Sequence, residues 1–302
     1  MATHHERDRG SQGSEGDQRR SSWGFAVSST GLDFTEHTIV SAHFEACRGA
    51  YAHLLGQVGI QPGWHVLDAG CGNGDFLPWL AELVGPHGSV NAVDLAEENV
   101  KAATEGLNQW RQPCPVDIRH GDLLRLPYAD ASFDAAWCAN TVQYLDDDAL
   151  AAALAELRRV VRPGGVVAVK DLDAHLVTAR PGDPYLFADF FRAASAVPGY
   201  ARQLLRSRDL YRYLKRAGLV NIRQQTVLIE HYAPLTPQAH AFYGPSCATL
   251  AGQALSLGLD EQWRAFTEPN SPENPLNHPD GYVSEGNVLA IGTVPERVTR
   301  PL

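Results

Sequence analysis

Short apolar segments alternate with helix-like segments through the middle of the chain, and this alternation limits the fold most. One helix-like segment, 147–161, carries apolar residues at positions 150, 154, 157 and 161, a spacing typical of a packed helix. Strands that alternate with helices in this way form a parallel sheet covered on both faces. The sequence therefore predicts an α/β fold with a doubly wound, seven-stranded, mostly parallel Rossmann-like sheet. The predicted strands are residues 65–69, 89–95, 116–120, 133–139, 166–172, 221–232 and 287–294.

The segments outside this pattern indicate how the rest of the 302-residue chain is organised. Residues 1–22 contain almost no apolar side chains, which predicts a disordered tail. Residues 23–58 predict a helical N-terminal segment, and the α/β domain spans 59–302. Two insertions, 173–205 and 233–286, follow the carboxyl ends of predicted strands. Because open parallel sheets bind ligands beyond these ends, we expect the N-terminal segment and both insertions to form a helical lid.

Composition restricts the class of partner. The net charge of −10 argues against nucleic acid or an anionic membrane as the main partner. No apolar run approaches the length of a transmembrane helix. The five cysteines are odd in number and form no CxxC pair, so we expect neither a disulfide framework nor a zinc site. We expect a cytoplasmic monomer or homodimer that acts on a small molecule.

A glycine-rich turn follows the first predicted strand in the sequence VLDAGCGNGD (66–75). Glycine lets a backbone turn tightly and approach a ligand that a Cβ atom would exclude. Asp68 precedes the turn, and its carboxylate disfavours a diphosphate because like charges repel. The turn therefore predicts a site for an amino-acid-like group rather than for a dinucleotide.

Acidic residues also close the next two predicted strands. Asp94 ends the second strand, where nucleoside-binding α/β folds hold the ribose hydroxyls, and Asn99 could reach the same ribose. Asp122 follows the third strand and could accept a hydrogen bond from the amine of adenine. Each feature alone has a simpler explanation, since Asp75 of the glycine-rich turn or Asp122 could instead cap a helix. Three acids at the ends of successive strands predict a nucleoside site.

Together these motifs resemble the class I S-adenosylmethionine-dependent methyltransferases. The matching segments are 66–76, 93–95, 120–134 and 157–171, and segment 126–134 is most similar to small-molecule enzymes of the ubiquinone, sterol and natural-product type. The resemblance implies S-adenosylmethionine as cofactor. The residues that it implies are Asp68, Gly70, Cys71, Gly72 and Gly74 for the methionine end, Asp94, Leu95 and Asn99 around the ribose, Gly121, Asp122 and Leu123 for adenine, and Asn140, Gln143 and Tyr144 at the methyl-donor face.

A general base is needed only where the acceptor carries a proton near neutral pH. The catalytic candidates are His175, just past the fifth strand, and Tyr144, past the fourth. A single lid histidine is more often structural than catalytic. Lys170 and Asp171 end the fifth strand and are expected to pair with each other. The acidic run 146–148 is explained by a helix N-terminus, so we expect no metal. More distant base candidates are His37, His43, His231, Tyr232 and His240.

These observations predict methyl transfer to an O, N or C atom of a small aromatic or heterocyclic secondary metabolite, with an indole carbon among the options. One alternative is a nicotinamide-dependent oxidoreductase, which the GxGxG spacing and Asp68 disfavour. Another is a catalytically inactive methyltransferase-like binding protein, which the intact set of motifs disfavours. A flat acceptor suits the aromatic residues of the expected lid, which are Trp23, Phe25, Phe34, Phe44, Tyr185, Phe187, Phe190, Phe191, Tyr200, Phe242 and Tyr243.

Overall fold

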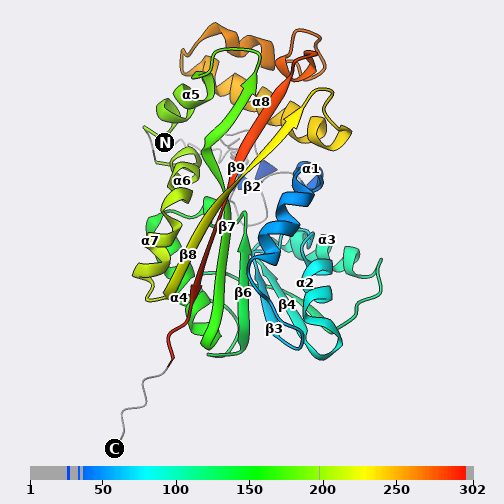
Figure 1. Cartoon of the computed structure of the whole chain (residues 1–302), viewed down its shortest axis with the longest axis vertical. Coiled ribbons are helices and arrows are strands. Elements are labelled where there is room, and N and C mark those ends of the chain that lie inside the picture. The colour runs from blue at the N-terminus through cyan, green and yellow to red at the C-terminus, as the bar shows by residue number, and fades with distance from the viewer. Residues whose placement is uncertain (1–25, 28–32, 35–36, 197, 297–302) are drawn as a thin grey trace, which may run out of the picture.

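Seven strands form one sheet in the order β5-β4-β3-β6-β7-β9-β8 (Figure 1). The structure is a computed structural model that describes residues 26–27, 33–34, 37–196 and 198–296. The neighbours from β5 to β7 pair in parallel, and β9 runs antiparallel to both β7 and β8. The predicted doubly wound, mostly parallel sheet is confirmed. The strands are β3 (His65–Ala69), β4 (Ser89–Asp94), β5 (Val116–His120), β6 (Phe133–Ala139), β7 (Val161–Arg180), β8 (Val220–Tyr232) and β9 (Tyr282–Thr293), with a separate pair β1 (Ala26–Val27) and β2 (Asp33–Phe34).

Helices cover both faces of this sheet. One apolar core lies between the sheet and the helices α1 and α2, and a second lies between the sheet and α4 and α7. The helices are α1 (His37–Gly56), α2 (Leu77–Val84), α3 (Glu97–Leu107), α4 (Asp147–Val160), α5 (Leu186–Ala194), α6 (Tyr200–Arg206), α7 (Leu210–Arg216) and α8 (Pro237–Ser256). Short 3₁₀ helices are η1 (Gly85–His87), η2 (Val142–Tyr144), η3 (Ser207–Asp209), η4 (Glu261–Phe266) and η5 (Pro275–Asn277).

Helix α4 shows how the sequence specifies these elements. Asp146 caps its N-terminus by accepting a hydrogen bond from the backbone of Ala149. Acidic residues lie in its first turn and arginines in its last, which suits the helix dipole. The buried apolar residues recur at helical spacing and face the sheet. The acidic run 146–148 is thus accounted for by the start of this helix.

Two strands of the sheet, β7 and β9, are longer than the sequence predicts. Strand β7 continues to Arg180, although we expected residues after Leu172 to be helical. Strand β9 begins at Tyr282 rather than Asn287, and the two extensions pair with each other across a register shift. The predicted limits of both insertions are therefore wrong at these ends. The physical reason is that each extension satisfies the backbone of the other, which no local pattern reveals.

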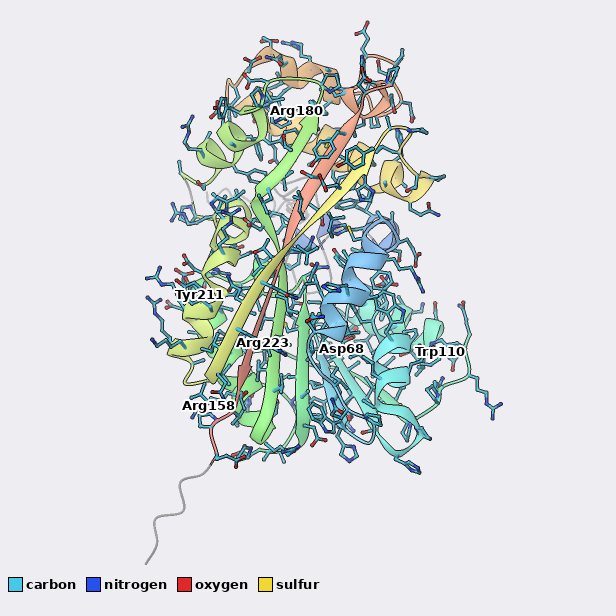
Figure 2. All side chains as sticks on the ribbon, viewed as in Figure 1. Asp68, Trp110, Arg158, Arg180, Tyr211 and Arg223 are labelled. Atoms are coloured by element: carbon cyan, nitrogen blue, oxygen red, sulfur yellow. The ribbon has the colours of Figure 1, made fainter. Side chains whose placement is uncertain are left out.

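The extended ends of β7, β8 and β9 carry a third apolar core. The elements that form it lie in the upper half of Figure 1. We call the elements that surround this core the cap; they are α5, α6, α8, η4 and η5. Inside it, Phe187 packs edge to face on Trp263 and Phe266, and Phe190 packs edge to face on Trp263. Figure 2 shows Arg180 at the cap end of the molecule, Asp68 near its middle and Arg158 toward the opposite end.

Several expectations concern residues whose structure is not described. The predicted disordered tail, 1–22, lies outside the described residues, as do Trp23 and Phe25. In the part of the chain that the structure describes, no helix is both long and apolar enough to cross a membrane. All five cysteines are buried free thiols.

Candidate active site

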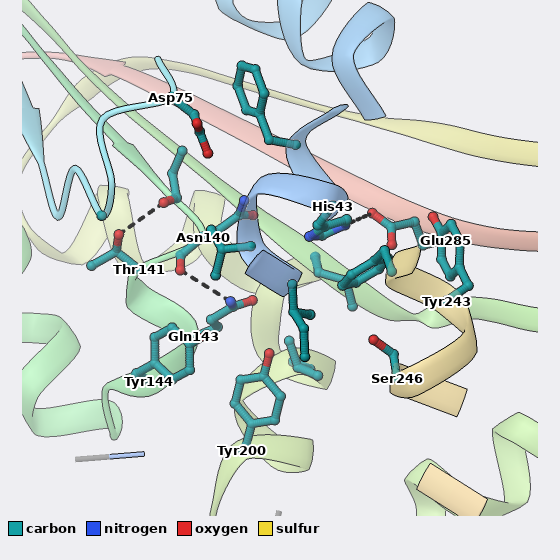
Figure 3. Close-up of a pocket in the computed structure, with 18 of the residues that line it drawn as sticks. His43, Asp75, Asn140, Thr141, Gln143, Tyr144, Tyr200, Tyr243, Ser246 and Glu285 are labelled. Carbon is teal, nitrogen blue, oxygen red and sulfur yellow. Dashed lines mark hydrogen bonds and ion pairs between the residues drawn. The ribbon is translucent and has the colours of Figure 1, made fainter. Parts of the chain in front are cut away.

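A cavity of about 350 Å³ lies at the carboxyl ends of β3, β4 and β6, next to the cap (Figure 3). Its wall is built from segments far apart in the sequence: the glycine-rich turn, the ends of β4 and β6, helix α1 and the cap helices. The predicted position of the site, beyond the carboxyl ends of the strands, agrees with this arrangement.

The glycine-rich turn forms one wall of the cavity. At Gly70, with φ of +79°, a Cβ atom would lie 2.4 Å from Thr141 Cγ2, so close packing excludes a side chain. At Gly72, with φ of +55°, a Cβ atom would meet nothing within 4 Å. Gly72 borders the cavity, so the missing side chain leaves open space there for a ligand.

Asp94 ties the turn to the helix that follows it. Its Oδ2 accepts a hydrogen bond of 2.8 Å from the Gly72 backbone, and its Oδ1 accepts one of 2.9 Å from Asn99 Nδ2. Both Asp94 and Asn99 line the cavity, although Asp94 is only 8% exposed. The structure therefore brings together the two residues that the sequence assigned to one ribose.

Asp68 lies behind the turn and is not among the residues that line the cavity. It is buried, and its Oδ2 has no hydrogen-bond partner among the described residues. Burial, together with the nearby charges of Asp94 and Asp75, raises the pKa of Asp68 to about 8. Asp75, which the sequence suggested only as a helix cap, is the carboxylate of this turn that borders the cavity (Figure 3).

A buried polar network continues from the end of β6. Asn140, with φ of +54°, accepts a hydrogen bond of 2.6 Å from Lys170 Nζ. The ammonium of Lys170 lies 3.7 Å from the centre of the Tyr51 ring. Burial lowers the pKa of Lys170 to about 8. The expected hydrogen-bonded pairing of Lys170 with Asp171 is wrong, since successive residues of a strand point to opposite faces.

His43 of α1 and Glu285 of β9 meet at the far side of this network. His43 Nε2 lies 2.8 Å from Glu285 Oε1, and the His43 ring stacks on Phe242 with centroids 3.8 Å apart. Burial raises the pKa of Glu285, but the charges of His43 and Lys170 outweigh it and hold that pKa at about 2. Sequence reasoning missed Glu285. The predicted last strand began at Asn287 and left Glu285 in an insertion, so no local signal marked its burial or its pairing.

Known proteins share this domain. A family model described as a methyltransferase domain matches residues 66–165. The demethylmenaquinone methyltransferase of Alkalihalophilus pseudofirmus is 31% identical over 162 residues, which cover 53% of this chain and 64% of that protein. The Staphylococcus aureus protein of the same name is 28% identical over 167 residues, covering 54% of this chain and 64% of that protein. The alignments thus span less than two thirds of these relatives.

Solved structures share the fold. A Bacillus halodurans protein provisionally described as a methyltransferase aligns with a TM-score of 0.52 and 18% identity, covering 81% of this chain and 98% of that one. The Haemonchus contortus phosphoethanolamine N-methyltransferase 2, solved with S-adenosyl-L-methionine, aligns with a TM-score of 0.52 and 15% identity, covering 85% of this chain and 57% of that one. Residues 66–165 therefore form a methyltransferase domain, and the chain has the fold of class I S-adenosylmethionine-dependent methyltransferases.

The residues of this methyltransferase domain fit S-adenosylmethionine on the cavity side. Gly72 leaves open space where a Cβ atom would stand, and Asp94 with Asn99 presents polar groups beside it. Of the thirteen expected cofactor contacts, those that line the cavity are Gly70, Cys71, Gly72, Asp94, Asn99, Asn140 and Gln143.

The other expected cofactor contacts are not among the lining residues. Asp122 is exposed, and its Oδ1 accepts a hydrogen bond of 2.8 Å from the backbone of Leu124. Leu123 is buried in the core beside α4. The residues that the structure places outside the cavity wall are Asp68, Gly74, Leu95, Gly121, Asp122 and Leu123. Their contact with the cofactor stays a prediction.

The two catalytic candidates of the methyltransferase domain lie in different places. Tyr144 lines the cavity and stacks on Tyr200, with ring centroids 5.4 Å apart. His175 lies outside the cavity wall, because β7 continues past its predicted end and carries this residue onto the strand extension. Its side chain is 42% exposed and its Nδ1 lies 2.7 Å from Asp173 Oδ1. Asp173 in turn pairs with Arg208.

Of the more distant general-base candidates that the structure describes, only His43 lines the cavity, and His231, Tyr232 and His240 do not. The side chain of His37 lies outside the described residues. Several expected lid aromatics are also elsewhere: Phe187 and Phe190 pack inside the cap, and Tyr185 is 68% exposed. The aromatic residues that do line the cavity include Phe44, Phe191, Tyr200, Phe242 and Tyr243.

Among the described residues, one group of side chains has donor atoms close enough to hold a metal ion. Ligand atoms of His43, Cys47 and Glu285 lie within 4.8 Å of one another. Burial raises the pKa of the Cys47 thiol well above its usual value, whereas a metal binds the thiolate. The buried ammonium of Lys170 near Glu285 also opposes a second cation. These three side chains are better suited to proton transfer than to binding a metal ion.

Proposed function

We propose that the chain transfers a methyl group from S-adenosylmethionine to an O, N or C atom of a small aromatic or heterocyclic molecule. The observation that carries this proposal is a single cavity shared by the donor turn and the cap. Gly72, Asp94 and Asn99 border it on one side, and the rings of Tyr200 and Phe242 on another. A concave site with few polar groups and aromatic walls suits a small flat ligand.

The relatives support a small-molecule acceptor. Demethylmenaquinone, which their name gives as substrate, is a fused-ring quinone, and aromatic walls suit such a ring system. The family model ends at residue 165, so it does not include β9 or the cap, which supply much of the wall beyond the donor turn. We therefore propose the class of acceptor and not its identity, with secondary metabolism as the setting.

Positioning and water exclusion account for most of the catalysis in this proposal. S-adenosylmethionine supplies an electrophilic methyl group on a sulfonium, and its positive charge is lost during transfer. Alignment of the acceptor with that group lowers the barrier by fixing the reacting atoms in place. The apolar rings of Phe44, Phe191 and Phe242 keep water from the site, which strengthens electrostatic interactions inside it.

The test is methyl transfer from S-adenosylmethionine that carries a deuterated methyl group. Purified protein is incubated with a panel of phenols, naphthoquinols, indoles and aromatic amines, and products are analysed by mass spectrometry. We expect a deuterated methyl group on at least one ring compound, with Asp94→Ala as a low-activity control. Tight donor binding without any product would favour the inactive binding protein, and binding of NADH instead would favour the oxidoreductase.

We also propose a cytoplasmic location, a monomer or homodimer, and no nucleic-acid partner. Five buried free thiols suit a reducing compartment, and the net charge of −10 opposes binding to phosphate backbones. Light scattering at two protein concentrations measures the oligomeric state. A larger assembly, or a gel shift with duplex DNA at physiological salt, would contradict this part of the proposal.

A further inference from the structure

The two ring nitrogens of His43 have different surroundings. Nε2 lies 2.8 Å from Glu285 Oε1, and the Tyr51 hydroxyl lies 3.2 Å from the same nitrogen. Figure 3 shows the other nitrogen turned away from Glu285, toward the side of the cavity where Asn140 and Gln143 lie. Among the described residues, no hydrogen bond to Nδ1 is found. A carboxylate bound to one ring nitrogen fixes the tautomer, so the proton is on Nε2 and Nδ1 can accept one.

The carboxylate partner is held firmly. Glu285 is buried, and Asn287 Nδ2 donates a 2.8 Å hydrogen bond to the same oxygen that faces His43. Phe242 stacks on the imidazole and fixes the plane of the ring. Titratable groups face this pair from every neighbouring element: Cys47 and Tyr51 of α1, Lys170 of β7, His231 of β8 and Tyr243 of α8.

We propose that His43 is the general base for an acceptor with an acidic O–H group, a phenol or an enol, and that Glu285 is its positioning residue. This inference rests on the proposed methyl transfer. The acceptor oxygen attacks the methyl carbon, the C–S bond breaks with its electron pair going to sulfur, and Nδ1 takes the O–H proton. The products are the methyl ether, S-adenosylhomocysteine and an imidazolium beside the Glu285 carboxylate.

The chemistry of the pair selects this class of acceptor. An aliphatic thiolate or a neutral amine already has an available electron pair for attack. A general base in the protein therefore adds little to the rate of transfer to such an acceptor. A hydroxyl is a weak nucleophile until its proton leaves, and a positioned base near neutral pH contributes typically 10²–10⁴-fold. The ionised carboxylate stabilises the imidazolium that forms, as in other carboxylate–histidine pairs.

The experiment compares two acceptors that differ in acidity. Calorimetry first measures S-adenosylmethionine binding to wild type, His43→Gln, Glu285→Gln and the control His87→Gln, an exposed histidine in η1. Initial methylation rates are then measured with 1-naphthol, which is protonated at neutral pH, and with 4-nitro-1-naphthol, which is largely ionised. We expect His43→Gln to lower the 1-naphthol rate at least about 100-fold and the nitronaphthol rate far less, with donor affinity within about twofold of wild type.

Glu285→Gln keeps the shape of the side chain and tests positioning. Without the negative charge, the rise of the pH–rate profile moves to lower pH and the maximum rate falls, whereas His87→Gln leaves the profile unchanged. Equal losses with both naphthols, an unmoved profile in Glu285→Gln, or methylation of neither naphthol by a chain that binds the donor would each overturn the inference. Failure to bind S-adenosylmethionine at all would instead overturn the proposed function.

Discussion

Asp94 connects three parts of the cavity wall through one carboxylate. It holds the turn at Gly72, the start of α3 and the side chain of Asn99. Replacing it with alanine removes a charged hydrogen-bond partner, so we expect Asp94→Ala to weaken S-adenosylmethionine binding by about 1–3 kcal/mol. Calorimetry measures this change, with Asp280→Ala, at a 90% exposed side chain, as control. An unchanged affinity would contradict the ribose assignment.

Gly72 and Gly59 form a matched pair of residues. Both have positive φ, +55° and +81°, and a Cβ atom at either would meet nothing within 4 Å, but only Gly72 borders the cavity. Alanine at either should lower stability by about 1–2 kcal/mol, because the left-handed conformation is strained with a Cβ atom. We expect only Gly72→Ala to weaken donor binding. Equal donor affinities in the two variants, measured by calorimetry beside their urea denaturation curves, would contradict the role of Gly72.

Residue patterns predicted the cavity wall at the glycine-rich turn better than the wall at His43 and Glu285. Gly70 and Gly72 follow β3, while Asp94 ends the neighbouring β4 and Asn99 lies in the first turn of α3, so local spacing was enough to bring them together. His43 and Glu285 are 242 positions apart and meet only after α1 packs beside β9. Single residues in a helix and a strand give no local signal of such a meeting.

At the scale of elements, the cap depends on its own aromatic core. Trp263 of η4 is fully buried against Phe187 and Phe190. We expect Trp263→Ala to destabilise the cap by about 3–5 kcal/mol, the usual range for a buried tryptophan. Hydrogen exchange should then speed up in α5 and α8 while β3, β4 and β6 stay protected. The exposed Tyr211→Ala is the control. Uniform loss of protection would show that cap and sheet unfold as one unit.

The elements of the sheet were predictable because their pattern is local. Helix α4 has its cap, its charges and its apolar stripe in one segment. The extensions of β7 and β9 were not predicted, because they stabilise each other over more than one hundred intervening residues. Pairing at that separation depends on the whole fold rather than on the propensity of either segment.

At the scale of the whole molecule, Asp68 should make stability depend on pH. Its pKa is about 8 in the folded chain and 3.8 in the unfolded one, so between these values the folded state binds more protons. The stability that Asp68 contributes is therefore full below pH 4 and is lost as pH rises toward 8, on the order of 1 kcal/mol per pH unit. We expect the free energy of unfolding of Asp68→Asn to rise relative to that of wild type as the pH increases from 5 to 8. Urea denaturation measures both free energies. If they change in parallel across that range, the raised pKa of the buried Asp68 carboxyl is contradicted.

Binding of the methyl donor is the central claim, since every proposal about the acceptor depends on it. The direct measurement is calorimetric titration of the purified chain with S-adenosylmethionine and S-adenosylhomocysteine, with NADH as the control ligand. The cavity at Gly72, Asp94 and Asn99 predicts micromolar binding of the first two and none of NADH. Binding of NADH with no response to either S-adenosyl compound would contradict the account.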